Sequence, residues 1–207
     1  MNANTYLRRI NYSGPLTPAA DTLRRLQVAH LLTVPFENLS IHWGEPIVLD
    51  DEALFDKVVR RRRGGFCYEL NGLFAALLRA LDFDVTMLSA AVKNDENGYG
   101  PDFDHMTLMV TLEERWLVDV GFGDCFREPL RLDDPRPQEE GHRAYRVASN
   151  GDYRVLQQRE GSASWQAQYR FTLTPYEYAD FDDMCRYHQT SPQSHFTQRR
   201  VCSRATP

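Results

Sequence analysis

Cys67 is the side chain in this sequence best suited to act as a nucleophile. The residues after it repeat with the spacing of one helix face, at Leu70, Leu73, Phe74, Leu77, Leu78 and Leu81. Cys67 lies three residues before this series, so it should face inward at the helix N-terminus. Backbone N–H groups and the helix dipole favour a thiolate there. Gly64 and Gly65 could bring further N–H groups to an oxyanion. The alternative is a small, half-apolar side chain that packs at the start of a buried helix.

A base and a carboxylate are predicted on a β-hairpin, because residues 105–112 and 115–120 alternate apolar and polar side chains. The apolar face comprises Met106, Leu108, Val110 and Leu112 on one strand and Trp116, Val118 and Val120 on the other. When these faces are buried together, His105 and Asp119 point the same way on the opposite face.

This arrangement depends on the turn of the hairpin. A two-residue turn at Glu113-Glu114 would pair Leu112 with Arg115 and would place the histidine and the aspartate on opposite faces. We therefore predict a three-residue loop or a bulge at this position.

Cys67, His105 and Asp119 could then supply a nucleophile, a base and a group that orients the base. In that arrangement the aspartate fixes the tautomer of the imidazole, which accepts the thiol proton. The alternative interpretation of the His–Asp pair is a polar edge on a barrel strand.

The first 83 residues are predicted to be helical. Thr17-Pro18 resembles an N-cap followed by a first-turn proline, for a helix that ends near Leu32. Asp50 should cap a second helix, whose basic end at Arg60–Arg63 suits the helix dipole. The arginine run also resembles a phosphate-binding patch, although a solvated helix end explains it as well.

From Asp84 the pattern changes to strands, so the chain is predicted to be α+β, with a helical part followed by a mostly antiparallel β part. A polar loop is predicted at 93–104 and a helix from Thr174-Pro175 to about His188. Besides the hairpin, strands are expected at Val85–Val92, 143–148, 153–158 and 165–173.

Composition excludes several classes of protein. The 207 residues are 42% hydrophobic and 26% charged, which is typical of a globular protein and not of a disordered or fibrous chain. The net charge of −5 argues against a nucleic-acid partner. No apolar run is long enough to span a membrane, and the N-terminus lacks a secretory signal, so we expect a cytoplasmic protein with reduced thiols.

No motif in the sequence predicts a bound zinc ion, dinucleotide or nucleoside triphosphate. Cys185, His188, His195 and Cys202 do not have the paired spacing of zinc ligands, so no metal site is expected. The Gly-x-Gly at 121–123 lacks the third glycine of a dinucleotide fingerprint, and the chain has no Walker A sequence.

The sequence resembles the arylamine N-acetyltransferases over essentially its whole length. Five segments carry the resemblance, namely Val34–Leu39 (VPFENL), Arg62–Gly72 (RRGGFCYELNG), His105-Met106, Trp116–Gly123 (WLVDVGFG) and Ser191–Phe196 (SPQSHF). The family's catalytic cysteine, histidine and aspartate fall at Cys67, His105 and Asp119.

The resemblance implies an acyltransferase that uses acetyl-CoA in a ping-pong reaction. Cys67 would take the acetyl group and pass it to the nitrogen of an arylamine or arylhydrazine, or to the oxygen of an N-hydroxyarylamine. The resemblance also implies a cysteine-proteinase-like core with a helical bundle at 1–83 and an antiparallel β-barrel at 84–190. A third, α/β lid domain would begin at 191–207.

The resemblance implies further roles at single residues. Gly121, Phe122 and Gly123 would line the acyl and acceptor pocket, with Phe36 and Phe66 as aromatic walls. Glu37 and Arg63 would form a buried structural ion pair, so reversing one charge should unfold the bundle.

Two features depart from the family pattern. Asp82 stands where the family usually has a glycine, at a left-handed helix end, which predicts a local loss of stability without a loss of chemistry. The chain stops at Pro207, and we expect most of the lid to be absent from it. Without most of the lid, we expect weak transferase activity and self-association through the uncovered surface.

Two alternative functions remain open from the residues alone. Other Cys-His-Asp enzymes, such as transglutaminase-like hydrolases, amide synthases or thioester hydrolases, share this order of residues, and only acetyl-CoA dependence separates them. A non-catalytic binding module would instead keep a slowly reacting thiol.

Overall fold

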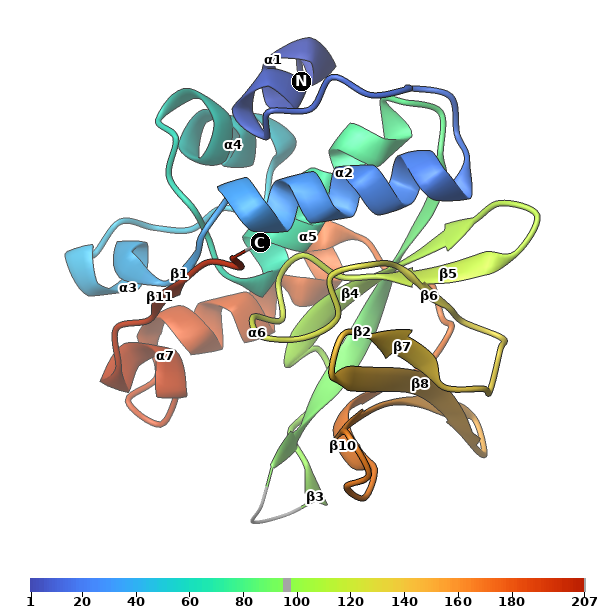
Figure 1. Ribbon diagram of the computed structural model, residues 1–207. Coiled ribbons are helices and arrows are strands. Elements are labelled where there is room, and N and C mark those ends of the chain that lie inside the picture. The colour runs from blue at the N-terminus through green and yellow to red at the C-terminus, as the bar shows by residue number, and fades with distance from the viewer. Residues whose placement is uncertain (95–97, 207) are drawn as a thin grey trace.

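The computed structural model describes residues 1–94 and 98–206, and helices and strands gather in two adjoining parts of it (Figure 1). The helices are α1 (Ala3–Arg9), α2 (Ala20–Thr33), α3 (Leu39–Trp43), α4 (Asp51–Phe55), the π-helical turn η1 (Asp56–Arg60), α5 (Cys67–Arg79), α6 (Tyr178–Thr190) and α7 (His195–Gln198). None of the described helices is long and apolar enough to cross a membrane.

The described strands form one nine-stranded antiparallel sheet and one small pair. The sheet has the order β6-β5-β4-β2-β10-β9-β8-β7, with β3 beside β2, and contact between β6 and β8 nearly closes it into a barrel. Its strands are β2 (Asp84–Asn94), β3 (Gly98–Tyr99), β4 (His105–Thr111), β5 (Arg115–Val118), β6 (Leu130–Arg131), β7 (Gln138–Glu140), β8 (Arg143–Asn150), β9 (Tyr153–Glu160) and β10 (Gln166–Phe171).

The α+β class is therefore confirmed, and its division at residues 83 and 190 stays a prediction. Helix α6 packs into the same hydrophobic core as the N-terminal helices, through Phe181 and Cys185. The predicted loop at 93–104 contains β3, and residues 95–97 lie outside the described part of the chain.

Helix α5 begins at Cys67, as its apolar spacing predicted, and its core-facing leucines are buried. The Asp50 carboxylate accepts hydrogen bonds from the N–H groups of Glu52 and Ala53, which confirms the predicted N-cap. Asp82 has a φ of 63°, so the left-handed conformation predicted after α5 is also confirmed.

Two predicted helix starts were wrong. Helix α2 begins at Ala20 rather than after Thr17, and Asp21 in its first turn binds Arg24 one turn later. Helix α6 begins at Tyr178 because the Asp180 carboxylate accepts the Glu177 N–H.

The residues just before α6 extend the sheet instead. The N–H of Tyr176 donates to the carbonyl of Met87 on β2, so this segment is held in a β-bridge. Pairing with the barrel backbone therefore keeps this segment extended, although Thr174-Pro175 favours the start of a helix.

The predicted register of the hairpin is confirmed. Thr111 pairs with Arg115 and Leu108 with Val118, which leaves a three-residue loop between β4 and β5. The apolar face of this hairpin packs on the helices in one core. Its other face, which includes Leu117, packs into the interior of the barrel.

A two-stranded pair that the sequence did not reveal joins distant segments (Figure 1). Strand β1 (Phe36–Glu37) pairs with β11 (Cys202–Ser203), and Phe36 also bridges to Gly65. The Asn38 side chain bonds the backbone of Phe196, Arg199 and Val201. The segment before α5 is thereby fastened to the far end of the described chain.

Candidate active site

Cys67 occupies the first position of α5 and is almost sealed from solvent, with 3% of its surface exposed. Burial raises the pKa of its thiol well above the usual range, and a backbone hydrogen bond from Met106 opposes this only in part. A thiol whose pKa is raised in this way needs a base to become a nucleophile.

His105 and Asp119 meet at the end of the hairpin, on the face that the register predicted. His105 Nε2 lies 2.6 Å from Asp119 Oδ2, and both residues are buried. Because a carboxylate can only accept a hydrogen bond, Nε2 carries the proton and Nδ1 is the basic ring nitrogen.

The Asp119 carboxylate receives hydrogen bonds on both oxygens. Oδ1 accepts from Asn71 Nδ2 at 2.8 Å and from the Gly121 N–H at 2.9 Å. Oδ2 accepts from His105 and from the Tyr169 hydroxyl at 3.1 Å. Burial by itself raises the pKa of Asp119, but attraction to His105 in its protonated form and the donated hydrogen bonds outweigh it and hold the pKa below its usual range.

Asn71 connects the helix of Cys67 to both strands of the hairpin. Besides its bond to Asp119, its Nδ2 donates to Met106 O at 2.7 Å, and its Oδ1 accepts the Val120 N–H at 2.8 Å. The sequence analysis missed this role. The available signal was a polar residue one helical turn after Cys67, among the apolar positions of the predicted helix.

Tyr169 on β10 was also missed, because nothing in the local sequence links it to the hairpin. Its ring packs against His105 and Phe122, with centroid separations of 5.2 Å and 5.0 Å. Phe122 also meets His105 edge-on at 5.1 Å. Aromatic surfaces therefore cover the imidazole on the side away from the helices.

The glycines around the site permit close backbone packing. A Cβ on Gly121 would lie 2.8 Å from the Cα of Cys67, so only glycine lets this loop approach the cysteine so closely. Gly123 has a φ of 100°, which a residue with a side chain rarely adopts. A Cβ on Gly64 would lie 2.0 Å from the Pro35 carbonyl.

A cavity of about 440 Å³ opens between α2 and the barrel beside this glycine loop. Of the residues expected to bind substrate, Phe36 and Gly123 line it. Gly121 packs on Cys67 and Phe122 on His105 instead. Phe66 is fully buried against Tyr68 and Phe196.

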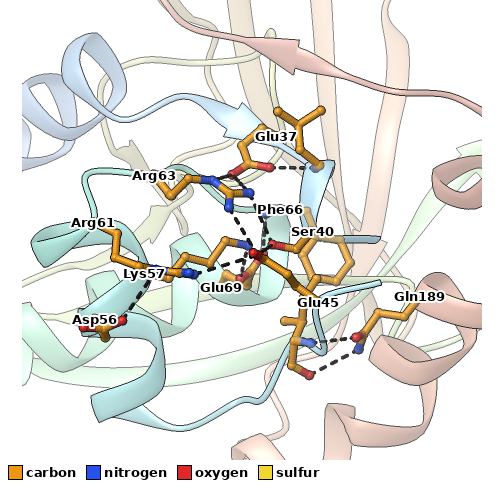
Figure 2. Close-up of polar contacts among 12 residues, drawn as sticks. Glu37, Ser40, Glu45, Asp56, Lys57, Arg61, Arg63, Phe66, Glu69 and Gln189 are labelled. Carbon is orange, nitrogen blue, oxygen red and sulfur yellow. Dashed lines mark hydrogen bonds and ion pairs between the residues drawn. The ribbon is translucent and has the colours of Figure 1, made fainter. Parts of the chain in front are cut away.

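The expected ion pair between Glu37 and Arg63 is present beneath the site (Figure 2). Arg63 Nη2 lies 2.9 Å from Glu37 Oε1, and the two side chains are 19% and 2% exposed. Arg63 also binds Glu45 and Ser40, while Glu37 accepts the Leu39 N–H. This network fixes the loop that enters α5.

Among the described residues, no group of three or more His, Cys, Asp or Glu side chains is placed to hold a metal ion. His188 and Ser194 instead hydrogen-bond each other at 3.1 Å, and Cys202 lies exposed on β11.

Comparisons with known proteins agree with one another. A family model described as N-acetyltransferase matches residues 20–207. The arylamine N-acetyltransferase of Escherichia coli (strain K12) is 38% identical over 99% of this chain and 73% of its own length. That of Mycolicibacterium smegmatis is 38% identical over 95% of this chain and 74% of its own length.

Solved structures give the same result. The arylamine N-acetyltransferase from Salmonella typhimurium superposes with a TM-score of 0.92 at 35% identity, covering 99% of this chain and 75% of that chain. The Mycobacterium marinum arylamine N-acetyltransferase in complex with CoA superposes with a TM-score of 0.91 at 36% identity, covering 99% and 78%.

Proposed function

The chain belongs to the arylamine N-acetyltransferase family, and from that premise we propose that it acetylates arylamine nitrogen through an acetylated Cys67. Acetyl-CoA is the co-substrate, as the CoA complex of a family member supports. The observation that carries the catalytic assignment is the buried 2.6 Å hydrogen bond from His105 to Asp119, on the strands beside the helix of Cys67.

The first half-reaction begins with a proton transfer. His105 Nδ1 takes the proton of the Cys67 thiol, and the resulting imidazolium is stabilised by the Asp119 carboxylate. The thiolate attacks the thioester carbonyl carbon, and the tetrahedral intermediate expels the thiolate of CoA. His105 returns its proton to that leaving group, which yields free CoA and acetyl-Cys67.

The second half-reaction reverses these roles. An arylamine or arylhydrazine nitrogen attacks the carbonyl carbon of acetyl-Cys67 while His105 accepts a proton from that nitrogen. The Cys67 thiolate leaves and recovers the proton from His105. The oxygen of an N-hydroxyarylamine could attack in the same way. Phe36 and Phe122 offer aromatic surfaces on which an aryl ring can pack.

The cavity beside Gly123 is a candidate site for the CoA moiety. Its walls include Arg127, His142 and Arg143, which are donors of the kind that bind phosphates. The two arginines pair with Glu140 and Asp124 at the protein surface. One side chain of each pair, Arg127 or Asp124, is 43% or more exposed, so phosphate groups could exchange for these partners.

Intact-protein mass spectrometry after brief incubation with acetyl-CoA tests this function. We expect one added acetyl group on the parent chain, none on Cys67→Ala, and loss of the group when an arylamine such as anisidine is added. The proposed nucleophile is wrong if Cys67→Ala is acetylated equally. If acetyl-CoA gives no adduct but a small activated acetyl ester acetylates Cys67, another acyl donor is required.

A further inference from the structure

Lys57 and Glu69 form an ion pair buried beneath the start of α5 (Figure 2). Lys57 Nζ donates to Glu69 Oε1 at 2.7 Å, and the two side chains are only 8% and 1% exposed. Lysine and glutamate are rarely buried this deeply. Because desolvation cancels much of the attraction, apolar residues of similar size are often as stable. Stability alone is therefore a poor explanation for this pair.

The pair reaches the backbone next to Cys67. Glu69 Oε2 accepts the N–H of Phe66, the residue directly before Cys67, at 3.1 Å. A Cβ on Gly65 would lie 2.9 Å from the same oxygen, so the chain is packed against the carboxylate. A single carboxylate thus links Lys57 to the turn that presents the cysteine.

Lys57 is itself fixed by an unusual local structure. It lies in the π-helical turn η1, and its carbonyl accepts the N–H of Arg63 at 3.0 Å. Single π-helical turns are rare and occur often at functional sites. The backbone of Lys57 therefore contacts the loop that leads to α5, and its side chain contacts α5 itself through Glu69.

We propose that Lys57 is a positioning residue for the nucleophile: its ammonium group neutralises and holds the Glu69 carboxylate, which fixes the backbone that presents Cys67. This inference rests on the proposed role of Cys67. Lys57 and Glu69 do not contact the reacting atoms; they act through Phe66.

The charges of the pair are a second way in which it could act on Cys67. A thiolate at Cys67 is disfavoured by a nearby negative charge and favoured by a nearby positive one. Burial raises the pKa of Glu69, and the Lys57 charge opposes that rise. The field of the pair extends to Cys185 on α6, whose pKa burial raises to about 12 while Glu69 raises it and Lys57 lowers it.

Other charged groups surround the pair and the cysteine, and none of them is substituted in the test. Near the pair lie Glu37, Glu45, Asp56, Arg61 and Arg63. Asp104 and Asp119 raise the pKa of Cys67, and His105 is its proposed base.

The test is the pH dependence of Cys67 acetylation by p-nitrophenyl acetate, an activated ester that needs no CoA site. Lys57→Met removes the charge that lowers the pKa of Glu69. Over the pH range in which Glu69 stays ionised, its uncompensated charge should raise the apparent midpoint of Cys67 acetylation. Glu69→Gln leaves the Lys57 charge, so the midpoint should fall. The Lys57→Gln/Glu69→Gln double variant should return close to the parent midpoint.

Two control variants define the baseline. Arg60→Met removes a cation from the same turn, where it pairs with exposed Glu52, and should leave the midpoint unchanged. Cys67→Ala supplies the background hydrolysis and tests the nucleophile separately. A burst that persists in this variant refutes the proposed nucleophile, and the inference with it, whereas unmoved midpoints in an active parent protein refute the inference alone. Thermal unfolding shows which variants are folded at the assay temperature.

Opposite shifts in the two single variants support the positioning role. A merely structural pair would lower the rate of both variants without moving the midpoints apart, and that result would overturn the proposal. If Lys57→Met does not fold, Glu69→Gln decides: a midpoint equal to that of the parent protein rejects the inference.

Discussion

Replacing Tyr169 with phenylalanine removes one hydroxyl group from the buried pocket around Asp119. Burial and the neighbouring Asp119 charge raise the pKa of Tyr169 well above its usual range, so the hydroxyl stays protonated and donates to Asp119 Oδ2. The substitution leaves the ring in place against His105 and Phe122. Thr107 keeps a hydrogen bond to the Val118 carbonyl. The change therefore removes the donor to Asp119 and a 3.2 Å hydrogen bond with Thr107 Oγ1.

The expected size follows from that one donor. Hydrogen bonds to charged groups contribute about 1.5–3 kcal/mol, and Asp119 keeps three other donors, so we expect a loss of about 1–2 kcal/mol in the free energy of unfolding. If this loss falls on the ionised form, the pKa of Asp119 rises by about one unit. If the same loss raises the activation free energy of Cys67 acetylation, the reaction slows by up to about thirtyfold.

Two measurements check this prediction: urea unfolding, and the burst of p-nitrophenol on acetylation of Cys67. The folded-state pKa of Asp119 is depressed, so the carboxylate contributes stability above its unfolded pKa and loses it as pH falls through the folded pKa. The destabilisation of Tyr169→Phe should therefore be complete at about pH 7 and fade only below about pH 4.

Tyr145→Phe is the matched control, since Tyr145 is equally buried in the same barrel core but packs against Phe126. Its acetylation rate should equal that of the parent protein. The reasoning is refuted if Tyr169→Phe retains both the parent unfolding free energy and the parent burst rate, or if both tyrosine variants slow acetylation equally.

Three further substitutions have distinct expected outcomes. Asp82→Gly removes the strain of a non-glycine residue in the left-handed conformation after α5. It should raise the free energy of urea unfolding by about 0.5–1 kcal/mol and leave the acetylation rate unchanged. A lower urea midpoint than that of the parent protein would contradict this. Arg63→Glu places a second carboxylate against buried Glu37. It should lower the free energy of unfolding by about 3–5 kcal/mol, which circular dichroism would show as a loss of cooperative thermal unfolding. A thermal unfolding curve like that of the parent protein would show that the pair is dispensable. Gly121→Ala inserts a Cβ 2.8 Å from the Cα of Cys67, so the burst should fall by about tenfold or more while far-ultraviolet dichroism is retained; an undiminished burst would mean that the loop can move away.

Local patterns predicted the elements that carry the proposed catalytic residues. The helical spacing after Cys67 placed it at the start of α5. The alternation on β4 and β5 fixed the three-residue loop that brings His105 to Asp119. These predictions succeeded because burial of one face constrains register strongly, even without knowledge of the partner strand.

Residues that act through long-range contacts were not predictable in this way. Asn71 was visible only as a polar residue in an apolar helix, and its partners come from two strands. Tyr169 reaches Asp119 across 50 positions of sequence, through strand β10, whose place in the sheet no local pattern sets. The short strands β1 and β11 are each two residues long and carry no periodicity.

The pairing of β1 with β11 has a consequence for how the protein is made. Asn38 leaves the ribosome early, yet its side chain bonds Arg199 O and Val201 N, which lie 161 and 163 positions later. The Pro35 carbonyl, against which Gly64 packs, therefore lies in a segment that lacks these later partners during most of translation. Contacts of such long range form late in folding. The loop that presents Cys67, the proposed nucleophile, should therefore reach its final structure only after residues 199–203 are synthesised, although Cys67 itself is made much earlier.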